Sequence, residues 1–177
     1  IAEVEPYLCR TKDGYLARNG DLRLRWRTAR PDPAVHALYE EYLAWRHPGG
    51  GMDEPGDDDF RRFLIAPWGI SDYLEIWEAD TLVAVAVTDV AQDSLSAVYT
   101  FWRPTHARRG LGVFCILQQV EQARRMGLRH LYLGYWIPGH PKMHYKAGFR
   151  PMEVLREGRW QPLMPDSDPG QAAGPAA

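Results

Sequence analysis

The stretch LSAVYTFWRPTHARRGLGVFCILQQVEQARRMGLRHLYL, residues 95–133, decides the fold. Its opening run of β-branched and aromatic residues, Leu95–Phe101, predicts a strand. Apolar residues then recur at helical spacing over Gly110–Met126, and Gly127 follows as the C-terminal cap of a predicted helix. The apolar run Leu128–Leu133 predicts the next strand. The stretch therefore indicates a strand, a turn, a long helix and a second strand.

Two helices are predicted upstream of this unit. Asp32 supplies an N-cap and Pro33 a first-turn residue for a helix that runs to about His47. Acidic residues at 57–59 then precede an apolar face that indicates a second helix, which ends near Pro67. We expect both helices to come before the sheet in the chain.

Strands and a short helix complete the pattern on either side. The β-rich runs Tyr73–Trp77 and Leu82–Val90 predict two strands that form an antiparallel meander with the strand at 95. Downstream, we expect a short helix at Lys142–Lys146. A hairpin of Met152–Leu155 and Arg159–Leu163 follows, with its turn at a Glu-Gly pair.

This order of elements is the one expected of a GNAT-like acyltransferase fold. We therefore predict an α+β domain over residues 31–163, with a mixed, mainly antiparallel sheet flanked by helices. Residues 1–30 begin abruptly with an Arg-rich, weakly periodic segment, and we expect them to be the end of a truncated or missing N-terminal region. Residues 164–177 are rich in Pro, Gly and Ala and predict a disordered tail.

Charge and composition limit the kind of partner. The 177 residues carry a formal net charge of −2, which excludes a basic field over the whole protein of the kind that binds nucleic acid. Any RNA contact must be local. The candidate RNA-facing segment gathers eight cationic residues: Arg103, His106, Arg108, Arg109, Arg124, Arg125, Arg129 and His130. An ordinary solvated helix face is the alternative.

The two cysteines do not indicate a metal site. Cys9 and Cys115 lie far apart and lack metal-ligand spacing, and Cys115 sits in an apolar helical run, which favours a core residue over a nucleophile. The sequence contains neither a signal peptide nor a long apolar run. We therefore expect a cytoplasmic protein without membrane contact.

Three sequence blocks carry a resemblance to a known family. The blocks are Ala44–Asp53 (AWRHPGGGMD); Val87–Val90 (VTDV) with Leu95–Phe101 (LSAVYTF); and Tyr132–Pro138 (YLGYWIP) with Pro141–Lys146 (PKMHYK) and Phe149–Pro151 (FRP). They resemble the R-H-x-x-G-G-M-D, S-x-V-Y-T-F, Y-L-G-Y-W-I, K-M-x-Y-K and F-R-P motifs in the C-terminal domain of the bacterial leucyl-tRNA–protein transferases and the related arginyl-tRNA–protein transferases. The resemblance spans roughly Asp32 to Leu163.

The resemblance implies a function, a co-substrate and partners. It implies transfer of leucine from leucyl-tRNA to proteins with N-terminal Asp or Glu, which marks them for N-end-rule degradation. Arginine as the donor is the close alternative. The Arg-Arg-Gly-Leu-Gly turn at 108–112 keeps open an acetyl-CoA-dependent N-acetyltransferase, and a non-catalytic module that binds tRNA or N-termini is the third possibility. No cofactor is expected here, since the cysteine-rich module with which family members bind a metal or iron–sulfur centre is not encoded. Oligomeric state stays open.

Candidate site residues fall into three groups. The catalytic candidates are Asp89, Tyr99, Tyr135, Lys142 and Tyr145. The candidates for binding aminoacyl-tRNA are Arg108, Arg109, Gly110, Gly112, Trp136, Lys142 and Lys146, and those for binding the acceptor peptide are Arg46, His47, Gly51, Met52 and Asp53. No metal ligands are expected.

Each assignment has a chemical reason and a simpler alternative. Aminolysis of an ester needs a proton acceptor, for which Asp89 is the candidate, although it could be only a strand-end turn residue. Tyr99 and Tyr135 could orient the ester or stack on the terminal adenosine, or they could simply pack. The spacing of Lys142 and Lys146 favours a surface pair on one helical face, whereas the family motif favours a tRNA contact. The glycines at 110 and 112 could cradle a phosphate or serve only a tight turn, and His47 could cap its own helix.

Overall fold

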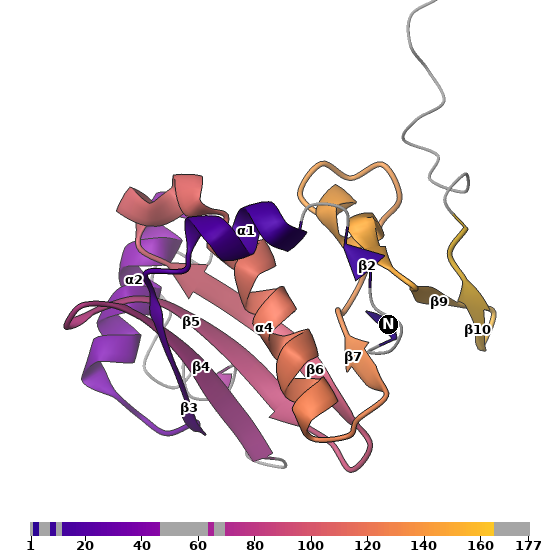
Figure 1. The fold of residues 1–177 in the computed structure, drawn as a ribbon, viewed down its shortest axis with the longest axis horizontal. Helices are drawn as coiled ribbons and strands as arrows, with labels where there is room; N and C mark the ends of the chain where they lie inside the picture. The colour runs from indigo at the N-terminus through magenta and orange to yellow at the C-terminus, as the bar shows by residue number, and fades with distance from the viewer. Residues whose placement is uncertain (1, 4–7, 10–11, 47–63, 66–69, 165–177) are drawn as a thin grey trace, which may run out of the picture.

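The computed structural model describes residues 2–3, 8–9, 12–46, 64–65 and 70–164 (Figure 1). Its elements in chain order are β1 (Ala2–Glu3), β2 (Leu8–Cys9), α1 (Lys12–Arg18), β3 (Arg23–Thr28), α2 (Pro33–Arg46), β4 (Ile70–Glu78), β5 (Thr81–Val90), β6 (Ser94–Trp102), η1 (Pro104–Arg109), α4 (Leu111–Arg125), β7 (His130–Tyr132), η2 (His144–Gly148), β8 (Phe149–Arg150), β9 (Glu153–Arg156) and β10 (Arg159–Pro162). The predicted α+β class is confirmed.

Within the described residues, the main sheet has six strands in the order β1-β7-β6-β5-β4-β3. Strands β3 to β6 form an antiparallel meander, and β6 pairs with β7 in parallel. A parallel pair needs a crossover, and α4 provides it. The predicted strand–turn–helix–strand unit is therefore confirmed, and with it the mixed, mainly antiparallel sheet of a GNAT-like fold.

Several predicted elements differ in detail. Residues 12–28, to which the sequence assigned no element, form α1 and the edge strand β3, which pairs with β4 along its whole length. The short helix predicted around Lys142–Lys146 is present as the 3-10 helix η2, but it begins two residues later, at His144, so Lys142 lies in the preceding turn. The predicted helix over 57–67 and the predicted tail fall mostly outside the described residues.

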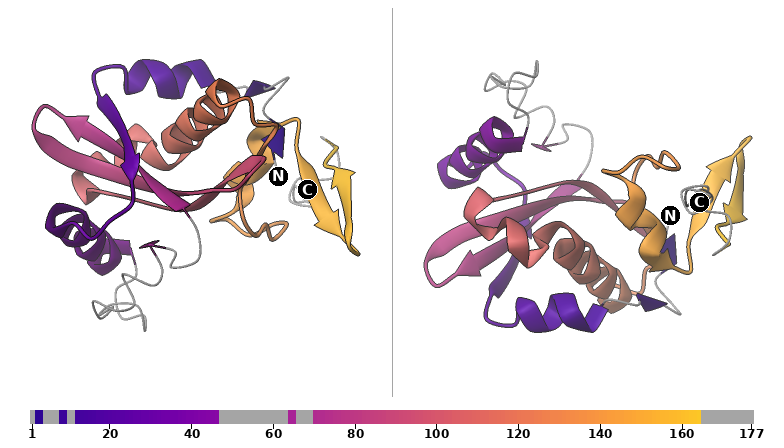
Figure 2. Two further views of the ribbon diagram at one scale, coloured as in Figure 1. Left: turned by 90° about the horizontal axis from the view of Figure 1, so that it is seen from below. Right: turned by 90° about the horizontal axis from the view of Figure 1, so that it is seen from above.

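The helices cover both faces of the sheet. Figure 2 shows α1 and α4 on one face, with α2 and the segment that follows β7 on the other. Between α2 and the sheet lies a core cluster that includes Leu38, Leu43 and Phe101. Between α4 and the sheet lies a second cluster, which includes Leu74 and Phe114. The alternating strand residues supply these two apolar layers.

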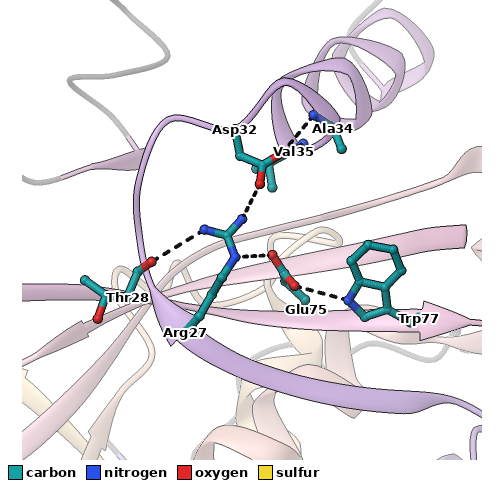
Figure 3. Close-up of polar contacts among 7 residues, drawn as sticks. All are labelled: Arg27, Thr28, Asp32, Ala34, Val35, Glu75 and Trp77. Atoms are coloured by element: carbon teal, nitrogen blue, oxygen red, sulfur yellow. Dashed lines mark hydrogen bonds and ion pairs between the residues drawn. The ribbon is translucent and has the colours of Figure 1, made fainter. Parts of the chain in front are cut away.

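A buried ion network fastens α2 to the sheet (Figure 3). Arg27 on β3 donates to Glu75 on β4 and, at 2.9 Å, to Asp32. Asp32 in turn accepts the backbone N–H of Ala34 at 2.9 Å, which confirms its predicted N-cap role. The side chains of Arg27 and Glu75 are only 11% and 3% exposed. The network thus fixes the start of α2 over β3 and β4.

The glycine turn before α4 is shaped by packing. Gly110 has φ +68°, and a Cβ atom added there would lie 2.5 Å from Cε1 of Tyr15. Gly127, at the other end of α4, has a similar φ of +69° but nothing within 4 Å. The two positions share a left-handed φ and differ in what an added Cβ atom would meet.

We expect Gly110→Ala to lower the free energy of unfolding by more than Gly127→Ala does. The left-handed conformation costs both variants roughly 1–2 kcal/mol, and only the first adds a clash with a ring. Urea denaturation of the two variants measures the difference. Equal losses would contradict a steric role for Tyr15.

Candidate functional site

A row of side chains crosses four strands at one level of the sheet. Ser71 on β4 pairs with Asp89 on β5, Asp89 with Ser96 on β6, and Ser96 with Tyr132 on β7. The Ser71 hydroxyl donates to Oδ1 of Asp89 at 2.6 Å, which orients the carboxylate. Neighbouring strands lie roughly 5 Å apart, so the carboxylate is one strand from Ser96.

Strand β7 ends at this row, whereas β6 continues beyond it. Their pairing in the described structure covers Ser94 to Ser96, while β6 continues to Trp102 (Figure 1). A bulge after Val87 places an extra residue on β6 in the same region. Among the described residues, the later part of β6 therefore has no paired strand on the β7 side.

A tyrosine cluster lies further along β6. The Tyr99 ring lies edge-on to Tyr39 and Tyr42, with ring centroids 6.2 Å away in each case. Burial, and then the neighbouring Tyr39, raise the pKa of Tyr99 to about 12, whereas the Arg46 guanidinium acts in the opposite direction. Burial likewise raises the pKa of Tyr42 to about 12, with Tyr145 among the groups that add to the rise.

These interactions bring together three residues that the sequence placed in two groups. The pKa of Tyr42 responds to Tyr99, Tyr145 and Arg46, so two catalytic candidates and one acceptor-binding candidate lie near Tyr42. Burial also raises the pKa of Tyr145. At neutral pH these hydroxyls are therefore protonated and able to donate hydrogen bonds.

A cavity of about 520 Å³ lies where β7 meets the hairpin of β9 and β10. It contains two more of the candidates, Tyr135 and Trp136. The full lining is Ser96, Tyr132, Leu133, Gly134, Tyr135, Trp136, Pro138, Met152, Glu153, Val154, Leu155, Arg156 and Trp160. Most of these side chains are aromatic or aliphatic, and the cavity falls in the size range of small-molecule sites.

Lys146 is turned toward the backbone of the cavity wall. Its ammonium donates to the carbonyl oxygens of Leu133 and Tyr135, at 2.7 Å each. Burial lowers the pKa of Lys146. Lys142 is exposed in the turn before η2, so the two lysines do not share a helical face as the spacing predicted. The contact made by Lys146 in this structure holds the segment after β7 in place.

The Arg108–Gly112 turn lies at the end of η1 and the start of α4. The Arg109 guanidinium donates twice to Asp21, at 2.9 and 2.7 Å, and lies 3.3 Å from Glu78. Gly112 is close to the Trp102 ring, which a Cβ atom would meet at 3.4 Å. Ion pairing therefore accounts for Arg109, and close packing against Trp102 accounts for Gly112. The side chain of Arg108 is exposed.

The cationic segment is divided between the two ends of α4. Arg103 and His106 lie in or beside η1, where Arg103 donates to Glu41 at 2.7 Å and His106 lies 3.2 Å from Glu78. Arg125, at the far end, pairs with Glu121 at 3.0 Å. Acidic side chains thus offset much of this charge, and the residues do not form one continuous basic face.

Four acceptor-binding candidates, His47, Gly51, Met52 and Asp53, lie outside the described residues. Within the described ranges, no group of three or more His, Cys, Asp or Glu side chains could hold a metal ion. No helix there has the length and apolar character that a membrane crossing requires.

Several residues that contact the candidates were not among the predicted site residues. Ser71, Ser96 and Tyr132 complete the row around Asp89, and Tyr42 joins Tyr99 to Arg46. Ser96 and Tyr132 lay within the quoted family blocks, so the motifs carried a signal for them. Ser71 had none, because its role depends on a pairing across strands.

Cys115 is fully buried in α4, as the apolar pattern predicted. Burial raises the pKa of its thiol to about 12, so the thiolate is scarce near neutral pH. We expect iodoacetamide at pH 8 to leave Cys115 unmodified in the folded protein and to alkylate it in denaturant. Peptide mapping by mass spectrometry checks both conditions, and labelling of the native protein would contradict a core role.

The chain is similar in sequence to a known family and to curated proteins. Residues 34–156 match the model of a family described as "Arginine-tRNA-protein transferase, C terminus". The chain is 49% identical over 158 residues to the aspartate/glutamate leucyltransferase of Stenotrophomonas maltophilia strain K279a, covering 86% of this chain and 63% of that protein. For the protein of the same name from Xanthomonas axonopodis pv. citri strain 306, the identity is 49% over 154 residues, covering 84% and 61%. The chain spans less than two thirds of these curated relatives.

Two solved structures are similar at lower identity. A Bacillus subtilis acetyltransferase in complex with CoA has a TM-score of 0.47 and 18% identity, covering 78% of this chain and 92% of that chain. The L-PGS of Bacillus licheniformis has a TM-score of 0.47 and 10% identity, covering 76% and 45%.

Proposed function

The chain belongs to the family described as arginine-tRNA-protein transferase, C terminus, and on that premise we propose that it transfers leucine from leucyl-tRNA to N-terminal Asp or Glu of acceptor proteins. The observation that carries the proposal is 49% identity over 158 residues to a protein named aspartate/glutamate leucyltransferase. Transfer would take place in the cytoplasm, where aminoacyl-tRNA is present, and would mark the acceptor for N-end-rule degradation. Aminoacyl-tRNA is the co-substrate, and no step here requires a further cofactor.

Asp89 is the proposed proton acceptor. The α-amine nitrogen of the acceptor attacks the ester carbonyl carbon, the bond from that carbon to the ribose oxygen breaks, and a peptide bond forms. The amine gives up one proton to the carboxylate, which returns it to the ribose oxygen as that oxygen leaves. The Ser71 hydroxyl, 2.6 Å from Oδ1, holds the carboxylate in position for this transfer.

Tyr99 and Tyr145 are the proposed hydrogen-bond donors to the tetrahedral oxyanion. A donor must keep its proton at working pH, and the raised pKa of each hydroxyl meets that need. Ser96 pairs with Asp89 and Tyr99 pairs with Val87, two residues along β5, so Tyr99 lies roughly 7 Å from Ser96 along the sheet. The reacting ester would lie along this part of β6, between the carboxylate and the tyrosines.

Arg46 is the proposed contact for the acidic side chain of the acceptor. It lies at the end of α2 and opposes the rise in the pKa of both Tyr42 and Tyr99, so its guanidinium is near Tyr99, one of the proposed oxyanion donors. A guanidinium can bind a carboxylate through two parallel hydrogen bonds. An acidic first residue held there would bring its own α-amine to the ester.

Transfer of radiolabelled amino acid tests the proposal. The full chain is incubated with leucyl-tRNA or arginyl-tRNA and with peptides that begin with Asp, Glu or Ala. Leucine on the two acidic peptides, and not on Ala, is the expected result. Transfer of arginine instead of leucine would make arginyl-tRNA the donor. The family description, which names an arginine-tRNA-protein transferase, favours this alternative. Acetyl transfer from acetyl-CoA without use of tRNA, or silence with every donor, would overturn the proposal.

A further inference from the structure

We propose that the cavity between β7 and the β9–β10 hairpin binds the leucyl-adenosine end of the donor, and that its apolar wall selects leucine over arginine. This inference rests on the proposed function, since it concerns the donor of that reaction. It assigns leucyl-adenosine to the cavity as ligand, and it gives the β9–β10 hairpin a role in the choice between donor amino acids.

The first argument is position. Ser96 and Tyr132 belong both to the row that contains Asp89 and to the cavity lining. The cavity therefore begins one strand from the proposed proton acceptor, roughly 5 Å away. Figure 1 shows the hairpin beyond β7, so a ligand in the cavity would extend from the edge of the sheet toward β5.

The second argument is the chemistry of the wall. Two tryptophans and two tyrosines line the cavity, and Tyr132 lies edge-on to Trp160 with ring centroids 5.8 Å apart. Aromatic faces stack on unpaired bases, so these rings suit the terminal adenine. Met152 and Val154 supply aliphatic surface of the kind that a leucine side chain buries. A cavity of about 520 Å³ has room for the aminoacyl group and the nucleoside together.

The third argument is charge. The lining contains Glu153 and Arg156, one charge of each sign, so it holds no net negative charge to attract an arginyl guanidinium. Burying that cation against the aliphatic wall would cost free energy that a leucine side chain does not lose. Lys146 is a positioning residue here, because its two bonds of 2.7 Å to backbone carbonyls hold the wall segment at 133–135.

The test uses stable amide analogues, 3′-leucylamino-3′-deoxyadenosine and its arginyl counterpart, with the full chain and isothermal titration calorimetry. Wild type is expected to bind the leucyl analogue at least about tenfold more tightly than the arginyl one. Val154→Trp, which fills the cavity, is expected to weaken leucyl binding by at least about tenfold. Met126→Trp adds the same ring to an exposed position at the end of α4 that is not in the lining, and it is the matched control.

Each outcome decides the inference. Loss of binding in Val154→Trp, with binding kept in Met126→Trp and equal melting temperatures, supports it. Unchanged binding in Val154→Trp, equal or tighter binding of the arginyl analogue, or no binding of either analogue overturns it. The proposed function can fail separately: absence of label transfer with intact analogue binding would remove the reaction and leave the cavity assignment standing.

Discussion

Arg27→Met is expected to lower the free energy of unfolding by about 3–5 kcal/mol, the largest stability effect of any substitution considered in this chain. The substitution leaves the Glu75 carboxylate, whose side chain is 3% exposed, without its ion-pair partner on β3. It also removes the 2.9 Å contact that joins β3 to Asp32 at the start of α2. Urea denaturation followed by circular dichroism measures the loss.

Two further variants separate the buried charge from the helix cap. Arg27→Met combined with Glu75→Gln removes both charges and leaves an acceptor for the Trp77 indole, so we expect it to recover much of the lost stability. Asp32→Ala removes the cap and should cost about 1 kcal/mol. If Arg27→Met alone costs less than about 1 kcal/mol, the network contributes no more than an exposed ion pair.

The same network explains why part of the fold could not be predicted. Strand β3 reads Arg-Leu-Arg-Trp-Arg-Thr, with arginines at alternate positions that look solvated in sequence. Arg27 is buried only because Glu75, 48 residues away, lies beside it. Leu24 stays 37% exposed, which weakens the apolar signal that would have indicated a strand. By contrast, the spacing of apolar residues within each of β6, α4 and β7 is enough to indicate the element, and the sequence predicted all three.

The candidate site shows the same division between local and distant information. Family motifs supplied Tyr99, Tyr145 and Arg46, which the structure brings together around Tyr42. They could not give the direction of a long side chain: Lys146 points at backbone carbonyls because the segment after β7 folds over it. The cavity depends on the position of the β9–β10 hairpin relative to β7. The residue pattern of the hairpin does not predict that position.

Asp89→Asn is expected to lower kcat/KM for leucine transfer by about 10²- to 10⁴-fold, the usual contribution of a general base. An asparagine keeps an oxygen that can accept the Ser71 hydroxyl bond of 2.6 Å, so the strand pairing and the fold should persist. The rate falls because the neutral amide cannot take up the proton of the attacking amine. Single-turnover transfer from leucyl-tRNA to an acidic peptide measures the effect.

The control is Ser71→Ala, which leaves the carboxylate in place and removes the hydroxyl that orients it. We expect a smaller loss of rate than in Asp89→Asn, because the proton acceptor remains while its position loosens. Affinity for the leucyl-adenosine analogue should stay unchanged in both variants, since neither residue lines the cavity. Wild-type turnover in Asp89→Asn would remove the carboxylate from the reaction and leave positioning of the two substrates as the main source of catalysis.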